Sequence, residues 1–505
     1  MRAIRAKQLL ISLNNNELKR LKLFLSSPYH TQQPALQDLA DLLIKLPDKK
    51  LKKLNQKKLY QLLFGDPVDQ DEAYCHKKVL NTLSDLALQI ESFMAHEQFQ
   101  NDPAQQQEYV SSFLSRRGTG KTFEHSIKKW KQLISRKKDA FSRYVSGYRM
   151  NRIHFESLHT DRHNTAKTDD YLERMDTEAT RAYWIAHLSY LCSRIFRSSI
   201  LEQEQGLQNQ ITRALQQTEA LIQGSEACPN IKMLRKLIVT GTTPGSFELY
   251  TSALGFFQRS FQQFSLKDQQ TFSHFLLTYC FTSYDKGSDD FLKLGFELSE
   301  WTRKKGIISS EHALSEAAFM NSAIMQLAMQ KSMESIEQYI TAYLPHVPQE
   351  VQLDAENLIR AYLDFHQGQY WPALEKINKI ERREAMYVTR KYSLQIRIIY
   401  HLFTQNDYRL DAFDSSIESF QKKFSSKTLK LAADKKKNYL HLARYIKAML
   451  GFHTGQPQCT GALLKELEQN LYYNPIPCRD WVKEQLHHIK EQQIITPLPE
   501  KVQIS

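Results

Sequence analysis

Apolar side chains recur every three or four residues over long stretches of this sequence, and this spacing constrains the fold more than any other feature. One example is the set Val79, Leu83, Leu86, Ile90 and Phe93, which share one face of a helix with about 3.6 residues per turn. The same spacing recurs in residues 18–25, 36–46 and 123–158. It predicts amphipathic helices whose apolar faces pack together.

Residues that end helices or favour strands are scarce. The chain has 16 glycines, 15 prolines and ten valines in 505 residues. Glycine and proline interrupt helices, whereas β-branched valine favours strands. With 41% hydrophobic and 24% charged residues, the chain is apolar enough to fold. We therefore predict an all-α protein, in which Pro28, Pro47 and Gly65 mark the ends of early helices.

Short motifs stand out in the first hundred residues. They are Phe24-Leu25-Ser26-Ser27-Pro28-Tyr29, then Leu80-x-x-Leu83-Ser84-Asp85-Leu86, and Phe93. Together they resemble the start of a group of uncharacterised all-helical bacterial proteins, and the resemblance extends through the C-terminal hairpins described next. It implies an all-helical scaffold and brings no activity with it.

Three segments of the C-terminal half place an aromatic residue three positions before Gly or Asn. They are Phe365 to Gly368, Phe403 to Asn406, and Phe452 to Gly455. Gly and Asn tolerate the left-handed conformation with which many helices end. Each segment therefore predicts the turn of a helical hairpin.

The first of these turns continues as Gly368-Gln369-Tyr370-Trp371-Pro372-Ala373-Leu374, which resembles the central turn of a tetratricopeptide (TPR) repeat. The resemblance implies a TPR-like α-solenoid, with Gly368 closing one helix, Phe365 and Tyr370 packing in the hairpin, and Ala373 allowing close approach. The other two copies are degenerate, because Asp411 stands where the repeat has Ala and Pro457 follows the third signature. Antiparallel hairpins without regular stacking are the alternative.

Turn-forming residues are densest between Gly224 and Ser246, and we place the main boundary there. The predicted organisation is an N-terminal helical region at residues 1–110, a long-helix region at 111–225, a TPR-like hairpin array at 246–492 and a tail at 493–505. Residues 123–158 are expected to form one or two long helices, with Gly147 as the break.

A phosphate-binding loop is suggested and then excluded by the segment Gly118-Thr119-Gly120-Lys121-Thr122. The full loop pattern needs a glycine at position 115, where the chain has Ser115. It also needs a buried strand before the loop, whereas residues 109–114 have a helical pattern. We interpret the segment as a turn between two helices and expect no cofactor.

Residues with metal-ligand or nucleophile chemistry do not form a recognisable site. His159 and His163 would share a helix face, but no cysteine or carboxylate at motif spacing completes a metal site. The cysteines at 75, 192, 228, 280, 459 and 478 are too far apart for a zinc motif and are expected to be thiols in a reducing compartment. No nucleophile elbow is found. We expect no metal and no catalysis, although an active site of scattered residues remains an alternative.

Positive charge is concentrated in two segments of a chain whose formal net charge is +13. Residues 116–149 hold eleven Lys and Arg against Glu124 and Asp139, and residues 422–447 hold nine against Asp434. On a helix, the apolar residues of 127–148 fall in one arc. The opposite arc is basic and would attract a polyanion, unless it is only a solvated helix face. Its members are Lys128, Lys129, Lys131, Arg136, Lys138, Arg143 and Arg149.

The sequence thus favours a non-catalytic protein–protein interaction scaffold. The alternative is a nucleic-acid-associated helical protein that binds the phosphate backbone through the basic face at 128–149. The apolar stretch at residues 9–13 is too short for a signal peptide, and no run of 18 apolar residues is present. We therefore expect a cytoplasmic location and no membrane association, with an unknown protein or a nucleic acid as partner.

Overall fold

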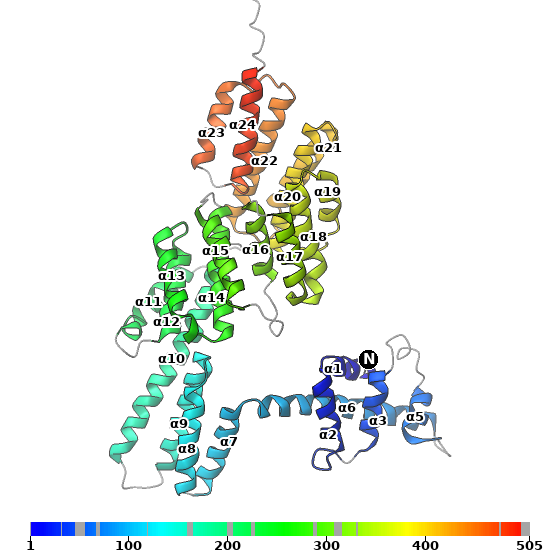
Figure 1. Ribbon diagram of the computed structural model, residues 1–505, viewed down its shortest axis with the longest axis vertical. Helices are drawn as coiled ribbons and strands as arrows, with labels where there is room; N and C mark the ends of the chain where they lie inside the picture. Colours follow the sequence, from blue (N-terminus) through cyan, green and yellow to red (C-terminus); the bar gives the residue numbers. More distant parts are fainter. Residues whose placement is uncertain are drawn as a thin grey trace, which may run out of the picture. The chain divides into compact units, whose positions relative to one another are not determined.

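The computed structural model describes residues 2–31, 33–45, 56–66, 71–118, 120–158, 165–198, 206–223, 228–285, 290–307, 316–329, 332–473 and 476–495. Every regular element in these ranges is a helix, so the chain is all-α as predicted (Figure 1). No helix in them has the length and apolar character needed to cross a bilayer. His159, His163 and residues 496–505 of the predicted tail lie outside the described residues.

The chain divides into two compact units. Unit 1 comprises Met1–Arg136 and Arg149–Leu172, and unit 2 comprises Lys137–Tyr148 and Glu173–Ser505. The predicted array range 246–492 lies wholly within unit 2, which also takes in the preceding helices from Glu173 onward.

Unit 1 is organised around one long helix, α6, on which α1, α2, α3 and α5 pack (Figure 1). Their shared core contains Leu21, Leu39, Val79 and Ile90. The helices of this unit are α1 (Arg2–Ile11), α2 (Asn15–Ser26), α3 (Ala35–Lys45), α5 (Gln56–Phe64), α6 (Glu72–Gln100), α7 (Pro103–Arg116) and α8 (Gly120–Ser135).

The ends of these helices follow local sequence signals. Asn14 caps α2, because its side chain accepts from the Glu17 amide at 3.0 Å while Glu17 accepts from the Asn14 amide at 2.7 Å. The α5 helix ends at Gly65, which has a φ of +82°. These ends agree with the boundaries predicted from Asn, Pro and Gly.

Helices α7 and α8 form a hairpin whose interior holds a small polar cluster. Gln107 Nε2 donates to Ser126 Oγ at 2.6 Å, and the Ser111 hydroxyl lies 2.7 Å from the same atom. Trp130 is fully buried beside them. Because helix α7 precedes Gly118, the strand that a phosphate-binding loop requires is not there.

Two further helices, α9 (Ala140–Leu158) and α10 (Thr165–Ser198), contribute residues to both units. The break between α8 and α9 falls at residues 136–139, so the predicted break at Gly147 is wrong. Asp139 begins α9 by accepting from the Ser142 amide at 2.6 Å. Gly147 lies inside α9, where a Cβ atom would be 2.8 Å from Glu178 Cδ on α10. The glycine thus allows close helix packing.

The first part of unit 2 has an aromatic-rich core. Tyr250 and Tyr279 stack with ring centroids 5.6 Å apart, and Phe291 contacts both edge-on. The elements here are α11 (Leu207–Gln217), η1 (Ala220–Ile222), α12 (Pro229–Thr242), α13 (Phe247–Ser260), η2 (Phe261–Gln263), α14 (Leu266–Asp285) and α15 (Asp290–Lys304).

Helix α12 occupies much of the segment 224–246, where we placed the main boundary. Ile231, Leu234 and Leu237 of this helix are buried in the core. Among the described residues of the segment, Pro229 begins α12 and Ser246 caps α13, so these turn-forming residues mark helix ends within unit 2. Gly224 and Ser225 lie outside the described residues.

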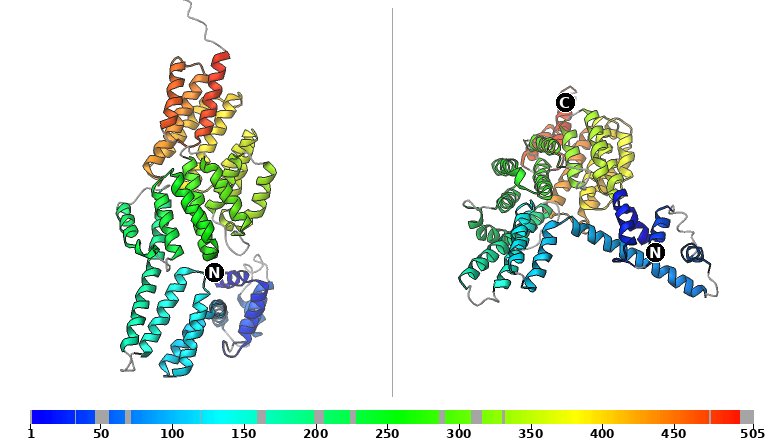
Figure 2. Two further views of the ribbon diagram at one scale, coloured as in Figure 1. Left: turned by 60° about the vertical axis from the view of Figure 1, so that its left-hand side comes forward. Right: turned by 60° about the horizontal axis from the view of Figure 1, so that its bottom comes forward.

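The second part of unit 2 is a series of helical hairpins around a continuous core. Helices α22, α23 and α24 lie side by side at its C-terminal end (Figures 1 and 2). The elements are α16 (Glu316–Ala328), α17 (Met333–Tyr343), η3 (Leu344–His346), α18 (Gln349–His366), α19 (Tyr370–Asn378), α20 (Ala385–Thr404), α21 (Leu410–Ser425), α22 (Ala433–His453), α23 (Gly461–Tyr473) and α24 (Arg479–Ile495).

All three predicted hairpin signatures end a helix in the left-handed conformation. Gly368 has a φ of +74°, Asn406 of +64° and Gly455 of +67°. In each case the next amide donates to a carbonyl five residues back, as Asp407 does to Leu402 at 2.9 Å. After each turn the following helix packs on both helices of the hairpin, as α20 does on α18 and α19, and α24 on α22 and α23.

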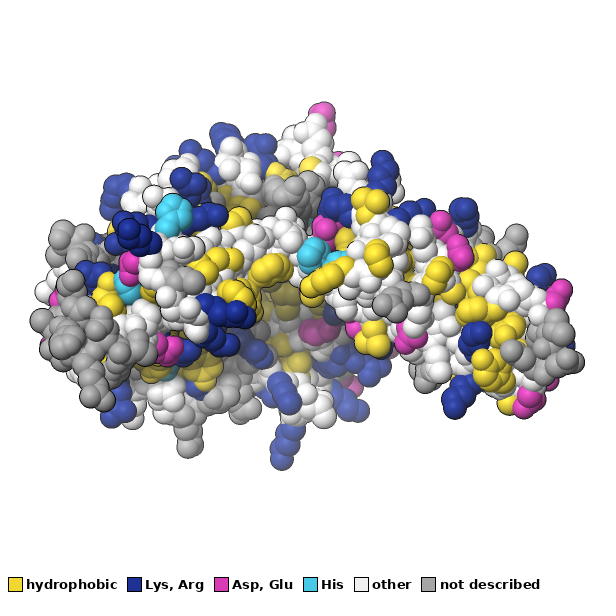
Figure 3. Space-filling view, turned by 90° about the horizontal axis from the view of Figure 1, so that it is seen from below, with side chains coloured by type: hydrophobic (Ala, Val, Ile, Leu, Met, Phe, Trp, Pro, Cys, Tyr) yellow, Lys and Arg dark blue, Asp and Glu magenta, His cyan; other side chains and the backbone are white. Residues whose placement is uncertain are grey.

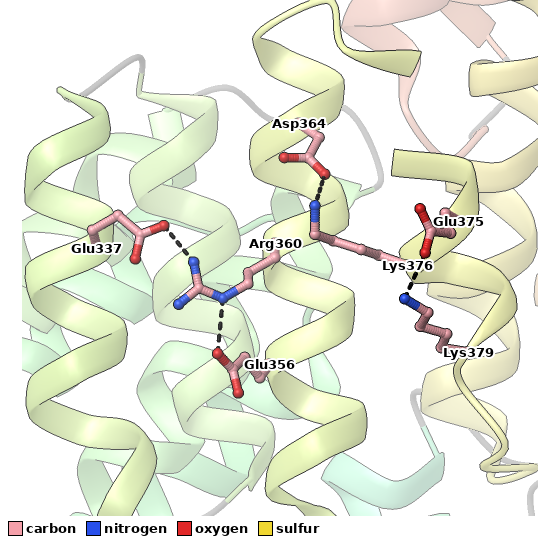
Figure 4. A network of polar contacts seen from close by, with 7 residues as sticks. All are labelled: Glu337, Glu356, Arg360, Asp364, Glu375, Lys376 and Lys379. Carbon is pink, nitrogen blue, oxygen red and sulfur yellow. Dashed lines mark hydrogen bonds and ion pairs between the residues drawn. The ribbon is translucent and has the colours of Figure 1, made fainter. Parts of the chain in front are cut away.

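Ion pairs tie neighbouring helices of the array together. Lys376 of α19 contacts Asp364 of α18, and Arg360 of α18 contacts Glu337 of α17 (Figure 4). The Asp364 side chain is largely buried, whereas Glu375 and Lys379 of α19 form a pair in solvent. The Lys376–Asp364 pair thus joins two helices at a partly buried position. The Lys379–Glu375 pair lies on the surface of one hairpin helix.

Candidate functional site

The four residues named for the TPR-like turn lie together at the α18–α19 connection. The Gly368 amide donates to Phe365 O at 3.1 Å, which closes α18. Phe365 is buried, and Ala373 is fully buried in α19, which packs against α18. The Tyr370 ring stacks on His401 of α20, with centroids 4.7 Å apart and planes at 2°. These residues thus hold the hairpin and the next helix together.

His401 links the turn to the last helix. Trp481 of α24 donates from Nε1 to His401 Nε2 at 2.9 Å, which requires an unprotonated nitrogen. Burial, together with the nearby charges of Arg397 and His488, lowers the pKa of His401 to about 4. Burial, together with the charge of Arg397, also lowers the pKa of His366 to about 4. Both imidazoles are therefore neutral at pH 7.

The basic residues predicted on one helix face are divided between two helices. On α8, Lys128, Lys129 and Lys131 are exposed, while Ile127, Trp130 and Ile134 form the buried side as predicted. None of these three lysines makes an ion pair with a residue that the structure describes. On the face seen in Figure 3, Lys and Arg side chains (dark blue) are more prominent than acidic ones (magenta).

The remaining members of the basic set depart from the prediction. Arg136 and Lys138 are exposed in the segment between α8 and α9, which is not helical. On α9, the Arg143 guanidinium lies 5.1 Å from the Tyr144 ring centroid, and Arg149 lies 3.4 Å from Glu108. Phe141, expected on the core arc, is 44% exposed. The prediction of a continuous basic face on one helix is therefore wrong, because the non-helical residues 136–139 interrupt it.

An exposed row of aromatic side chains lies on the unit 2 part of α10. Tyr183 and Tyr190 are 57% and 50% exposed. His187 lies between them, with its ring centroid 5.5 Å from that of Tyr183 and 6.2 Å from that of Tyr190. Arg194 continues the row, since its guanidinium lies 5.4 Å from the Tyr190 ring centroid. We call Tyr183, His187, Tyr190 and Arg194 the aromatic ladder.

Hydrogen bonds fix the end of the ladder. Arg194 Nη1 donates to Tyr190 Oη at 2.9 Å and to Gln210 Oε1 of α11 at 3.3 Å. The opposite side of α10 is buried at Leu188, Leu191 and Cys192. The ladder is therefore held on a helix that the core of unit 2 keeps in place.

The ladder was missed in the sequence, although a signal for it exists. Its members are spaced i, i+4, i+7 and i+11, which places them on one helix face. Aromatic residues at this spacing usually belong to the core, and the neighbouring Leu188 and Leu191 define a second apolar stripe that does. Which of the two stripes packs inward depends on α11 and α12, and these partners cannot be read from α10 alone.

No group of three or more His, Cys, Asp or Glu side chains placed to hold a metal ion occurs among the described residues. Two exposed surfaces stand out among the described residues: the lysine face of α8 and the aromatic ladder of α10. No protein-family model, curated protein or solved structure matches the chain.

Proposed function

We propose that the chain is a non-catalytic protein–protein interaction scaffold whose partner binds the aromatic ladder of α10. The ladder is the observation that carries the proposal. Tyrosine and arginine are enriched among the side chains that contribute most to binding energy at protein interfaces. Here Tyr183 and Tyr190 are exposed in one row with the half-buried Arg194, which is already hydrogen-bonded in place. A partner therefore meets a surface that needs little ordering on binding.

A protein partner suits the ladder better than a nucleobase does. Bases stack on open aromatic faces. The Tyr183 and His187 planes lie at 8° to one another, so each ring already covers a face of the other. The ladder also carries two tyrosine hydroxyls, and exposed tyrosines are common contacts in protein interfaces.

We further propose that α16–α24 form a TPR-like α-solenoid and that the protein is cytoplasmic. The left-handed ends at Gly368, Asn406 and Gly455 support the first proposal, since each is followed by another helix. Free cysteines support the second, because Cys75, Cys192 and the other four form no disulfide.

Affinity purification from native extract, with and without nuclease, tests the scaffold proposal. We expect a protein partner that stays bound after nuclease treatment and at moderate salt, because an aromatic interface is only weakly screened. A chain that purifies alone at every salt concentration would count against the proposal.

A second candidate function is binding of a nucleic-acid backbone through α8. It is favoured by Lys128, Lys129 and Lys131, which are exposed and unpaired among the described residues. The test is titration of generic RNA and duplex DNA at low salt, with the triple variant Lys128→Gln, Lys129→Gln and Lys131→Gln. For each phosphate that the variant no longer neutralises, the slope of log affinity against log salt should become shallower by about 0.9 on duplex DNA. Absence of binding at low salt would exclude this candidate.

A further inference from the structure

A cavity with a volume of about 410 Å³ lies inside unit 2. Its walls come from parts of the chain that are far apart in sequence: the end of α10, α14, α16, α18, α20 and the start of α22. Sites for small molecules typically have volumes of roughly 300–1,000 Å³. None of the four ladder residues lines the cavity, so it is a separate feature of the unit.

Positive charge surrounds this cavity. Arg197, Arg390 and Lys435 line it, and none of the described lining residues is Asp or Glu. Arg390 is only 7% exposed, and its guanidinium donates to Asn321 and lies 4.8 Å from the Phe281 ring centroid. Arg197 is exposed and Lys435 is half-buried, so both lie nearer to solvent. An anion entering the cavity would meet cations at the rim and another inside.

Two polar side chains of α14 that line the cavity have buried hydrogen-bonding atoms without a partner in the part of the chain that the structure describes. Among the described residues, neither Thr278 Oγ1 nor His274 Nδ1 has a hydrogen-bond partner. Thr278 is 7% exposed, and buried polar atoms in native proteins nearly always have a partner. The two residues are four apart and so share one face of α14. A polar ligand in the cavity would give these two groups the hydrogen bonds that they lack.

His274 can donate to an anion without adding a buried charge. Burial lowers the pKa of His274 below its ordinary value. The imidazole is therefore neutral at pH 7 and carries one N–H donor and one acceptor nitrogen. Together with Thr278 it adds a neutral donor pair to the charged group of Arg390.

Apolar side chains form the rest of the wall. Phe196, Phe275, Met386 and Leu431 are among them. A purely inorganic anion would leave these side chains without contact, whereas a ligand with an aromatic ring would bury its ring against them.

We propose that this cavity binds a small ligand in which a phosphate monoester is joined to an aromatic body, of the size of a mononucleotide. A phosphate monoester carries about −1.5 to −2 charge at pH 7 and has three strong acceptor oxygens. A carboxylate carries one negative charge and two oxygens, which suits three cationic side chains and two neutral donors less well. The inference goes beyond the scaffold function and does not depend on it.

Isothermal titration of the full-length protein tests the proposal. The probes are AMP, GMP, CMP and UMP, with adenosine and inorganic phosphate as the two halves of one of them. We expect at least one nucleotide to bind about tenfold more tightly than adenosine or phosphate alone, because only the intact ligand contacts both the donors and the apolar wall. If no nucleotide binds at millimolar concentration, or if phosphate binds as well as every nucleotide, the proposal is wrong.

Variants then locate the site. Thr278→Val removes a hydroxyl that has no partner and keeps the side chain's shape, so the free protein should be as stable as before while nucleotide affinity falls about tenfold. Arg197→Gln should weaken binding similarly. Matched controls are Arg213→Gln on α11 and Lys447→Gln on α22, both exposed and outside the cavity lining. Unchanged affinity in both Thr278→Val and Arg197→Gln would overturn the assignment, even if nucleotides bind.

Discussion

At the scale of single residues, His401 shows how burial fixes a protonation state. Its Nε2 atom accepts the Trp481 hydrogen bond, and its ring stacks on Tyr370. Protonation would abolish the acceptor and place a charge beside Arg397. The neutral imidazole therefore joins α19, α20 and α24.

Because His401 is neutral in the folded protein, we predict that the protein becomes less stable as pH falls from 6.5 toward 4. The pKa of His401 is about 4 when folded and about 6.5 when unfolded, so in this range the unfolded chain binds a proton that the folded chain does not. At pH 5 the loss should be about 2 kcal/mol for this residue. Urea unfolding of the wild type and of His401→Gln at pH 7 and pH 5 measures it. If the free energy of unfolding of the two proteins depended equally on pH, the role assigned to His401 would be wrong. The control is His487→Gln, which changes a histidine at an exposed position.

Gly368 is the residue that the α18–α19 turn most requires. Its φ of +74° is costly for any residue with a Cβ, although a Cβ there would meet no described atom within 4 Å. Gly368→Ala should therefore destabilise by roughly 1–2 kcal/mol through backbone conformation alone. Gly461→Ala is the matched control, because Gly461 has equal space around it and no left-handed φ. Equal urea midpoints for the two variants would show that the turn tolerates another conformation.

At the scale of elements, the α18–α19 hairpin depends on a partly buried ion pair. Lys376→Met leaves the Asp364 carboxylate, whose side chain is 10% exposed, without its cation (Figure 4). We expect a loss of about 2 kcal/mol in the free energy of unfolding. Lys379→Met removes the same charge from the exposed pair with Glu375 and should cost less than about 0.5 kcal/mol. Similar losses for both variants, measured by urea unfolding, would refute this difference.

Helix ends were predictable wherever one local signal decided them. Asn14 begins a helix through its side-chain cap, and a left-handed residue ends each of four others. These residues are Gly65, Gly368, Asn406 and Gly455. The break between α8 and α9 was not predicted, because residues 136–139 contain neither Gly nor Pro and the only signal is the Asp139 cap. Conversely, Gly147 looked like a break but allows Glu178 of α10 to pack closely. Its role depends on a second helix.

At the scale of the whole molecule, the all-α class followed from spacing and composition, but the binding surfaces did not. Which stripe of α10 is exposed depends on how α11 and α12 cover the other side, and the local pattern allows either. The cavity could not be predicted from any short stretch of sequence, because its lining residues run from Ser193 to Tyr439. The basic face was predicted from charge and from the spacing of one continuous helix, and the non-helical residues 136–139 divide it.

The central claim is that the aromatic ladder of α10 binds a protein partner. Its most direct test is recovery of that partner, by quantitative affinity purification after nuclease treatment, with the double variant Tyr183→Ala and Tyr190→Ala. The control is Tyr29→Ala, which removes a tyrosine that is 91% exposed elsewhere in the chain. We predict that the double variant folds, with an unchanged melting temperature, and recovers at least about tenfold less partner, as expected for interface tyrosines, while the control recovers as much as the wild type. Equal recovery by the wild type and the double variant would contradict the claim.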